Sequence, residues 1–205
     1  MNIIGIYLAA GNSRRMGKNK LALPTANGTV GSLALQTALT SSLEKVYVIT
    51  KHNEPDWLPR EMALHEKCNL ITCPSAQEGQ SESLRCGILQ AQKEKANAAI
   101  VLLADQPFIT NQMIDDMITL MKEEPSIKFV AASYQHITRP PVLFSSFMFP
   151  TILEIKGDIG AKNLLRGEFF RHGKMLDFDD EKLFFDVDTV EDYDKLHHFL
   201  NGPFN

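Results

Sequence analysis

The sequence predicts an α/β protein built around a mainly parallel β-sheet. Short apolar runs that suit buried strands alternate along the chain with amphipathic helical patterns. The expected strands cover residues 3–8, 46–50, 69–73, 98–103 and 129–132, and the expected helices cover residues 32–43, 81–93 and 110–122. Ligands of such sheets bind beyond the carboxyl ends of the strands. The candidate binding segments are therefore residues 9–20, 74–80 and 105–108.

The last third of the chain has a less regular pattern that prolines interrupt. An apolar strand is expected over residues 183–187 and a closing helix over residues 190–200. Thr189 and Asp192 have the spacing of a capping box at the start of that helix. We find no repeat, low-complexity tract or linker, so we expect one domain over residues 1–205.

Composition excludes several classes of protein. The 205 residues are 44% hydrophobic and 22% charged, which is ordinary for a globular chain. A formal net charge of −4 argues against a general nucleic-acid surface. No apolar stretch reaches the roughly 18 residues of a membrane span, and no basic segment precedes the first apolar run as in a signal peptide.

The cysteines favour a reducing compartment. Cys68, Cys73 and Cys86 are odd in number and form no C-x-x-C pair. A disulfide framework and a zinc site are therefore disfavoured, and buried or half-buried thiols are expected. We expect a cytoplasmic protein.

A strongly basic loop, LAAGNSRRMGKNKLALP, follows the first expected strand at residues 8–24. Gly11 and Gly17 permit backbone conformations that expose N–H groups to an anion. The segment matches neither a Walker A loop nor G-x-G-x-x-G. Composition alone balances a phosphate site against a solvated basic loop about evenly. The cations that would bind phosphate are Arg14, Arg15, Lys18 and Lys20.

Carboxylates follow two of the apolar runs. Asp105 ends the run at residues 98–103, where it can bind Mg²⁺ or simply form a turn or cap. Asp186 and Asp188 share a face of the expected strand at residues 183–187. The acidic residues around them also suit the first turn of the closing helix.

A glycine and two serines mark the start of the helix expected at residues 81–93. Gly79 precedes that helix, and Ser81 or Ser83 could cap it. Spacing alone favours an ordinary junction between a loop and a helix.

Five segments in order resemble the MobA-like nucleotidyltransferases, in particular their molybdenum cofactor cytidylyltransferase branch. The opening loop matches L-A-A-G-x-S-x-R-M-G-x-x-K-L-x-L-P. The other matches are G-x-x-x-S-L-x-x-G at residues 79–87, D-Q-P at 105–107, G-D-x-G-A-K-x-L-L at 157–165 and D-V-D-T-x-E-D-Y at 186–193. The resemblance implies a three-layer α/β/α, Rossmann-like fold of the nucleotide-diphospho-sugar transferase type.

The resemblance also implies roles for individual residues. Asp105 and Asp188 are the implied metal ligands, and Asp186 is the lesser candidate. The implied metal is Mg²⁺, with Mn²⁺ as the alternative. The segment at residues 157–165 belongs to the acceptor side. The catalytic residues are Arg14, Arg15, Lys20 and Asp105. The nucleotide-binding residues are Leu8, Ala9, Ala10, Gly11, Lys20, Gly79, Ser83 and Asp105.

The implied reaction transfers CMP from CTP to the molybdenum-molybdopterin cofactor and releases pyrophosphate. The acceptor is a phosphate monoester that is already ionised, so it needs no general base. The product would supply an apo molybdenum hydroxylase such as xanthine dehydrogenase, in purine catabolism.

Two departures from the pattern keep alternatives open. Ala10, where guanylyl relatives tend to have glycine, favours CTP over GTP, but Gln80 replaces a common methionine. Arg139-Pro140-Pro141 replaces the usual G-x-P or H-P element and leaves the acceptor open. The rival functions are transfer to a sugar or polyol phosphate, and a non-catalytic carrier of the cofactor.

Overall fold

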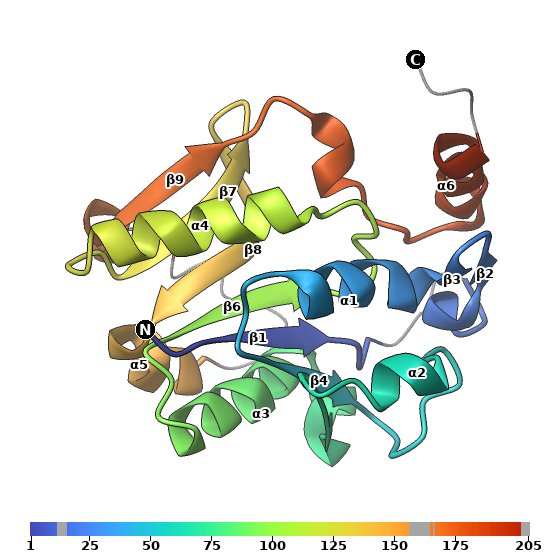
Figure 1. Cartoon of the computed structure of the whole chain (residues 1–205), viewed down its shortest axis with the longest axis horizontal. Helices are drawn as coiled ribbons and strands as arrows, with labels where there is room; N and C mark the ends of the chain where they lie inside the picture. The colour runs from blue at the N-terminus through green and yellow to red at the C-terminus, as the bar shows by residue number, and fades with distance from the viewer. Residues whose placement is uncertain (12–15, 156–164, 166, 202–205) are drawn as a thin grey trace.

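The centre of the protein is a seven-stranded sheet (Figure 1). The computed structural model describes residues 1–11, 16–155, 165 and 167–201. The strand order is β5-β4-β1-β6-β8-β7-β9. All neighbouring strands are parallel except that β8 is antiparallel to β6 and β7, so the predicted mainly parallel sheet is confirmed. The strands are β1 Ile3–Leu8, β4 Lys45–Thr50, β5 Cys68–Thr72, β6 Ala98–Leu103, β7 Phe129–Tyr134, β8 Ile137–Ser145 and β9 Gly173–Asp177.

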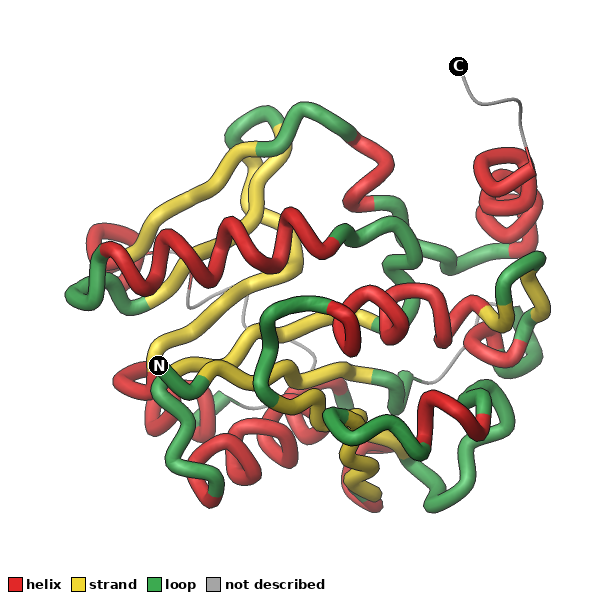
Figure 2. The backbone as a smooth tube through the Cα atoms, viewed as in Figure 1, coloured by secondary structure: helices red, strands yellow, loops and turns green. Residues whose placement is uncertain are grey.

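Helices cover both faces of the sheet and give three layers, α/β/α (Figures 1 and 2). On β1, Tyr7 points into a core shared with α1 and α4, whereas Ile6 points into a core shared with α3 and α5. This alternation follows from the two-residue period of a strand. The helices are α1 Val30–Thr40, α2 Arg60–Ala63, α3 Gln80–Lys93, α4 Asn111–Glu123, α5 Phe149–Leu153 and α6 Val190–Asn201.

Side chains cap the starts of α4 and α6. The Thr110 hydroxyl accepts a hydrogen bond from Met113 N at 3.1 Å and caps α4. At α6, Asp192 Oδ2 accepts from Thr189 N at 3.0 Å, and Asp192 N donates back to the Thr189 hydroxyl at 3.2 Å. The capping box predicted from the spacing of these two residues is confirmed.

The strand predicted over residues 183–187 is wrong. Residues Glu181–Phe184 form the 3-10 helix η6 instead, because the Asp180 carboxylate caps it by accepting from Lys182 N at 2.9 Å. The chain then runs extended, and Val187 N donates to the Asp105 carbonyl at 2.9 Å. This bond brings the acidic segment against the end of β6.

The prolines after residue 134 interrupt the sequence pattern, but they do not end the sheet. β8 runs through Pro140 and Pro141, and the β7–β8 register shifts between Ala131 and Ala132 at that point. Proline cannot donate to a ladder of hydrogen bonds and is tolerated at such irregularities. Because Val142 pairs with Val101 on β6, the preceding residues of β8 continue past the carboxyl end of β6.

The close approach of α3 to β1 depends on Gly87. A Cβ at this position would clash with Cγ2 of Ile6, whose side chain is fully buried. We expect Gly87→Ala to lower the free energy of unfolding by about 1–3 kcal/mol, as overpacking of a core does. Urea denaturation of this variant and of Arg85→Ala, an exposed control on the same helix, measures the effect. Equal stability of the two variants would contradict this packing.

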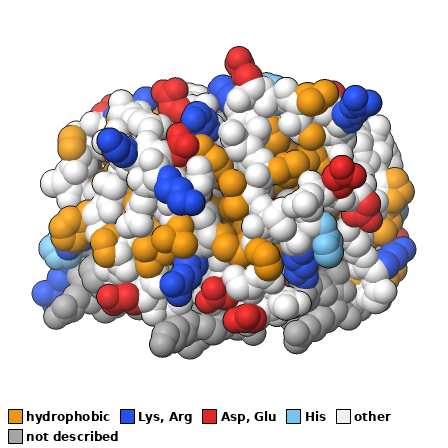
Figure 3. Space-filling model, turned by 90° about the horizontal axis from the view of Figure 1, so that it is seen from below, with side chains coloured by type: hydrophobic (Ala, Val, Ile, Leu, Met, Phe, Trp, Pro, Cys, Tyr) orange, Lys and Arg blue, Asp and Glu red, His pale blue; other side chains and the backbone are white. Residues whose placement is uncertain are grey.

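Among the described residues, no helix is long and apolar enough to cross a membrane. Figure 3 shows the molecule from the side on which α3 lies in Figure 1. Basic and acidic side chains are interspersed there with apolar ones, and the described residues of this face form no broad basic stripe.

Candidate functional site

Lys20 lies between two carboxylates at the carboxyl edge of the sheet. Its Nζ donates to Asp105 Oδ2 and to Asp188 Oδ1, both at 2.7 Å. Lys20 begins the 3-10 helix η1 (Lys20–Ala22), Asp105 follows β6, and Asp188 precedes α6. The side chains of Lys20, Asp105 and Asp188 are 11%, 25% and 43% exposed. Three distant segments thus place one ammonium and two carboxylates at a single point, and we call these residues the Lys20 cluster.

The carboxylates keep Lys20 charged. Burial alone would lower the pKa of its ammonium group, but the charges and hydrogen bonds of Asp105 and Asp188 raise that pKa above its ordinary value. Lys20 therefore carries a positive charge throughout the neutral pH range.

Asp186 adds a third acidic group next to the cluster. Burial of its carboxyl, followed by the negative charge of Asp105, raises the pKa of Asp186 to about 6, although part of the residue faces solvent. A hydrogen bond from Gln106 and the charge of Lys20 act in the opposite direction. The acidic residues therefore repel one another here, and a further cation would relieve that repulsion.

One pocket of about 300 Å³ opens beside the Lys20 cluster, and we call it the Gly79 pocket. One wall is the end of β1 with the start of the opening loop, and the other is the segment from the 3-10 helix η2 (Pro74–Glu78) to α3. The structure thereby brings together six of the residues predicted to bind nucleotide: Leu8, Ala10, Gly11, Gly79, Ser83 and Asp105.

The other predicted residues are placed differently. Ala9 lines a neighbouring hollow of about 620 Å³, together with Gly17, Lys18 and residues 50–52. Arg14 and Arg15 lie outside the described residues, as does all of the segment at residues 157–165 except Leu165, which is buried. Neither Ser81 nor Ser83 caps α3, because both are buried within the helix and Gly79 occupies the capping position.

A further pocket of about 430 Å³ meets the cluster at Asp188, and we call it the Arg139 pocket. Arg139 comes from the part of β8 that extends past β6, and Asp186 and Asp188 form another wall. The Arg139 Nε atom is buried and has no hydrogen-bond partner among the described residues. A buried donor without a partner is costly, so this atom is suited to bind an acceptor group of a ligand.

Local sequence patterns did not predict the other residues that line the Arg139 pocket. Lys182, Phe185 and Phe199 line it, and the Lys182 Nζ lies 4.8 Å from the centre of the Phe199 ring. Phe185 and Phe199 meet edge to face. Lys182 lies in η6 and Phe185 directly after it, whereas Phe199 lies on α6, so only the folded chain brings Phe199 to the other two.

The Lys20 cluster and its surroundings fit a divalent metal ion. Mg²⁺ prefers oxygen ligands, commonly one or two carboxylates together with substrate phosphates. Asp105 and Asp188 supply two convergent carboxylates, and the buried Oε1 of the neighbouring Gln106 has no partner among the described residues. This donor set consists of hard oxygen atoms, as such an ion requires.

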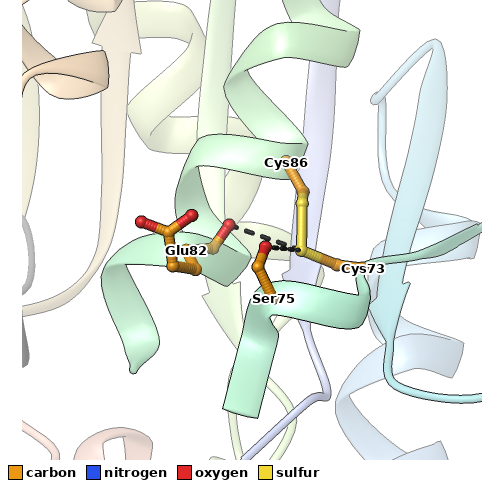
Figure 4. Close-up of a disulfide and its surroundings, with 4 residues drawn as sticks. All are labelled: Cys73, Ser75, Glu82 and Cys86. Atoms are coloured by element: carbon orange, nitrogen blue, oxygen red, sulfur yellow. Dashed lines mark hydrogen bonds between the residues drawn. A yellow bond between two sulfur atoms is a disulfide. The ribbon is translucent and has the colours of Figure 1, made fainter. Parts of the chain in front are cut away.

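Two cysteines form a disulfide next to the Gly79 pocket, contrary to the prediction of free thiols (Figure 4). Cys73 precedes η2 and Cys86 lies on α3, and their Cα atoms are 6.3 Å apart. The prediction was wrong because η2 turns the chain so that Cys73 lies beside α3. The spacing of the cysteines in the sequence does not reveal this turn. Cys68 is a free, half-buried thiol.

Two named proteins are similar to this chain in sequence. The purine catabolism protein PucB of Bacillus subtilis (strain 168) is 36% identical over 204 residues, which are 97% of this chain and 98% of that protein. A protein of Mycobacterium avium (strain 104) named "Probable molybdenum cofactor guanylyltransferase" is 30% identical over 124 residues, 60% of this chain and 59% of that protein.

A solved structure shares the fold. The crystal structure of Rv0371C of Mycobacterium tuberculosis H37Rv in complex with manganese superposes with a TM-score of 0.75 at 22% identity, and covers 97% of this chain and 99% of that chain. The model of the MobA-like NTP transferase domain matches residues 5–175. This match includes most of β1 and both residues of the Lys20–Asp105 pair, and with the PucB likeness over nearly the whole chain it shows that the protein belongs to the MobA-like NTP transferase family.

Proposed function

We propose that the chain transfers CMP from CTP to the molybdenum-molybdopterin cofactor and releases pyrophosphate. The observation that carries this proposal is the position of the Lys20 cluster between two pockets, because a transferase must bring a donor and an acceptor to one charged centre. Residues 1–205 act as one transferase domain in this proposal. The sequence likeness to PucB and to a named molybdenum cofactor guanylyltransferase supports the acceptor.

In the proposed mechanism, the Gly79 pocket holds the nucleoside. Ala10, Gly79 and Ser83 would contact the base and ribose. The triphosphate extends toward Lys20, and Arg14 or Arg15 of the opening loop adds positive charge. A fixed ammonium in a partly buried site stabilises the charge that develops on the departing pyrophosphate.

Asp105 and Asp188 would hold the metal ion, Mg²⁺ or Mn²⁺, with Asp186 nearby. When bound, this ion neutralises phosphate charge. The manganese complex of a protein with the same fold supports a divalent ion. The acceptor phosphate is ionised at neutral pH, so the protein contributes alignment and charge neutralisation rather than a general base.

The Arg139 pocket would hold the acceptor. Its buried Nε donor and the Lys182 ammonium suit a phosphate group, and its phenylalanine rings suit a planar heterocycle. A cytoplasmic location is part of the proposal, because nucleoside triphosphates are made and used there. The client would be an apo molybdenum hydroxylase such as xanthine dehydrogenase.

Pyrophosphate release by the purified protein tests the proposal. CTP, GTP, ATP and UTP are each assayed with Mg²⁺, with and without molybdenum cofactor. Release with CTP only when the cofactor is present is the expected result. Release with GTP instead would show that CTP is not the donor, but would leave the molybdenum cofactor as the acceptor. Release with a sugar or polyol phosphate but not with the cofactor would overturn the acceptor, and no release at all would favour a carrier.

Removing Arg139 should weaken binding of the acceptor alone. We expect Arg139→Ala to raise KM for the acceptor by about 10- to 100-fold, the usual effect of losing a charge-assisted hydrogen bond. KM for the nucleotide should stay unchanged, because Arg139 does not line the Gly79 pocket. Steady-state kinetics in both substrates measure this, with Arg171→Ala as an exposed control. Equal increases in both KM values would contradict the assignment.

A further inference from the structure

The disulfide closes the loop that forms one wall of the Gly79 pocket. Cys73 and Cys86 are 13 residues apart, and between them lie η2 and the first turns of α3 (Figure 4). The wall residues within this loop are Ala76, Gln77, Glu78, Gly79, Gln80 and Ser83. More than half of the residues that line the pocket therefore lie within a loop that this covalent link closes.

Local hydrogen bonds hold the rest of this loop. Ala76 N donates to the Cys73 carbonyl at 3.1 Å, Gly79 N to the Ala76 carbonyl at 3.4 Å, and Glu82 N to the Gly79 carbonyl at 3.2 Å. Gly79 itself has φ +150°, a conformation that L side chains rarely adopt. Cys73 N also donates to the Thr50 carbonyl at 2.8 Å, and Ala76 is buried in the core, so the start of the loop is anchored to the sheet. The disulfide adds a covalent link between this start and the second turn of α3.

The surroundings of Cys73 suit both redox states. The Ser75 hydroxyl lies 3.5 Å from the Cys73 Sγ atom, and the Glu82 carbonyl oxygen also lies 3.5 Å from it. In the disulfide the sulfur has no hydrogen, so only the Ser75 hydroxyl can donate. In the reduced form the thiol of Cys73 can donate to the Glu82 carbonyl. Reduction therefore leaves this fully buried residue with a partner.

We propose that the Cys73–Cys86 disulfide is a reversible switch that sets the affinity of the Gly79 pocket for a nucleotide. The oxidised form holds the wall in its binding position, and the reduced form loosens it and binds more weakly. The proposal rests on the nucleotide-binding role given above to this pocket. It also agrees with the cytoplasmic location, since disulfides in that compartment are commonly transient and redox-sensing.

Glutathione can reduce the disulfide by thiol–disulfide exchange. A glutathione thiolate attacks the Cys86 sulfur, which is partly exposed, while Cys73 is fully buried. The S–S bond breaks, and Cys73 leaves as a thiolate that can accept a hydrogen bond from Ser75. A second glutathione thiolate then releases Cys86 and forms glutathione disulfide, so that two electrons reach the protein and two protons complete its thiols. Oxidation by glutathione disulfide reverses these steps.

Cys68 offers a matched control. It lies on β5 as a free thiol, and burial raises its pKa to about 11. Its thiolate fraction at neutral pH is therefore small, and it exchanges slowly.

Nucleotide affinity in the two redox states tests the switch. The dissociation constant of CTP is measured by calorimetry on the full chain, oxidised with glutathione disulfide or reduced with dithiothreitol. We expect affinity about tenfold weaker on reduction, because binding must then order several flexible side chains of the wall. Cys73→Ser/Cys86→Ser should show the weaker value in both buffers, and Cys68→Ser should respond as the parent protein does.

Two results would overturn the switch. One is equal affinity in both buffers while mass spectrometry shows the disulfide forming and breaking. The other is free Cys73 and Cys86 thiols even in glutathione disulfide. If neither redox form binds CTP, GTP, ATP or UTP, the proposed function fails. Hydrogen exchange then decides on the switch, because amides of residues 74–82 should exchange faster on reduction, and unchanged exchange would overturn it.

Discussion

Asp105→Asn is expected to lower kcat/KM for pyrophosphate release by about 10³-fold or more. The substitution keeps the size of the side chain but removes the charge that pairs with Lys20 at 2.7 Å and that would hold the metal ion. Losing one preorganised electrostatic group commonly costs about 10²–10³-fold in kcat, and here both the ion and the orientation of Lys20 are affected. Steady-state kinetics with saturating acceptor measure the loss.

The matched control for this variant is Asp179→Asn. Asp179 is an exposed aspartate shortly before η6 and lines none of the three pockets described above. It should leave kcat/KM unchanged. Asp105→Asn should fold normally, because Lys20 retains its hydrogen bond to Asp188. If Asp105→Asn folds and keeps more than half of the parent activity, Asp105 is not part of the catalytic centre.

Periodicity predicted the sheet well because its central strands are buried on both faces. β1 and β6 match the expected residues 3–8 and 98–103 at both ends, since each is a continuous apolar run. The second half of the sheet was harder to predict. β9 has few buried residues, and β8 crosses two prolines at an irregularity of register. Partner strands, rather than local preference, determine these elements.

The centre of the site could be predicted because each of its residues follows a recognisable element. Asp105 stands directly after an apolar strand, and Asp188 stands directly before a capped helix. Contacts between distant segments could not be predicted in this way. The pairing of Cys73 with Cys86 depends on the turn of η2, and the Arg139 pocket forms only where residues of β8, η6 and α6 meet in the folded chain. Neither leaves a pattern within one stretch of sequence.

Lys20→Met should lower both the activity and the stability of the protein. Activity should fall by about 10³-fold, because the variant lacks the positive charge that would face the departing pyrophosphate in the proposed mechanism. Without metal, the variant should also be less stable by about 1–3 kcal/mol, because Asp105 and Asp188 then lose the ammonium group that lies between them. This loss of stability is smaller than for a fully buried ion pair, because the side chain of Asp188 is 43% exposed and water screens its charge.

The metal distinguishes this explanation from simple loss of packing. In the proposed site, Mg²⁺ would bind the folded state through the two carboxylates, and a ligand of the folded state stabilises it by mass action. Removal of the competing ammonium should strengthen that binding, so Mg²⁺ should raise Tm more in Lys20→Met than in the parent protein. Lys20→Met/Asp188→Asn should recover part of the stability without metal, lose the added response to Mg²⁺, and remain inactive. Thermal unfolding with and without Mg²⁺ measures all three proteins. An equal response to Mg²⁺ in all three would mean that these carboxylates do not bind the ion, and would leave Lys20 as a structural cation.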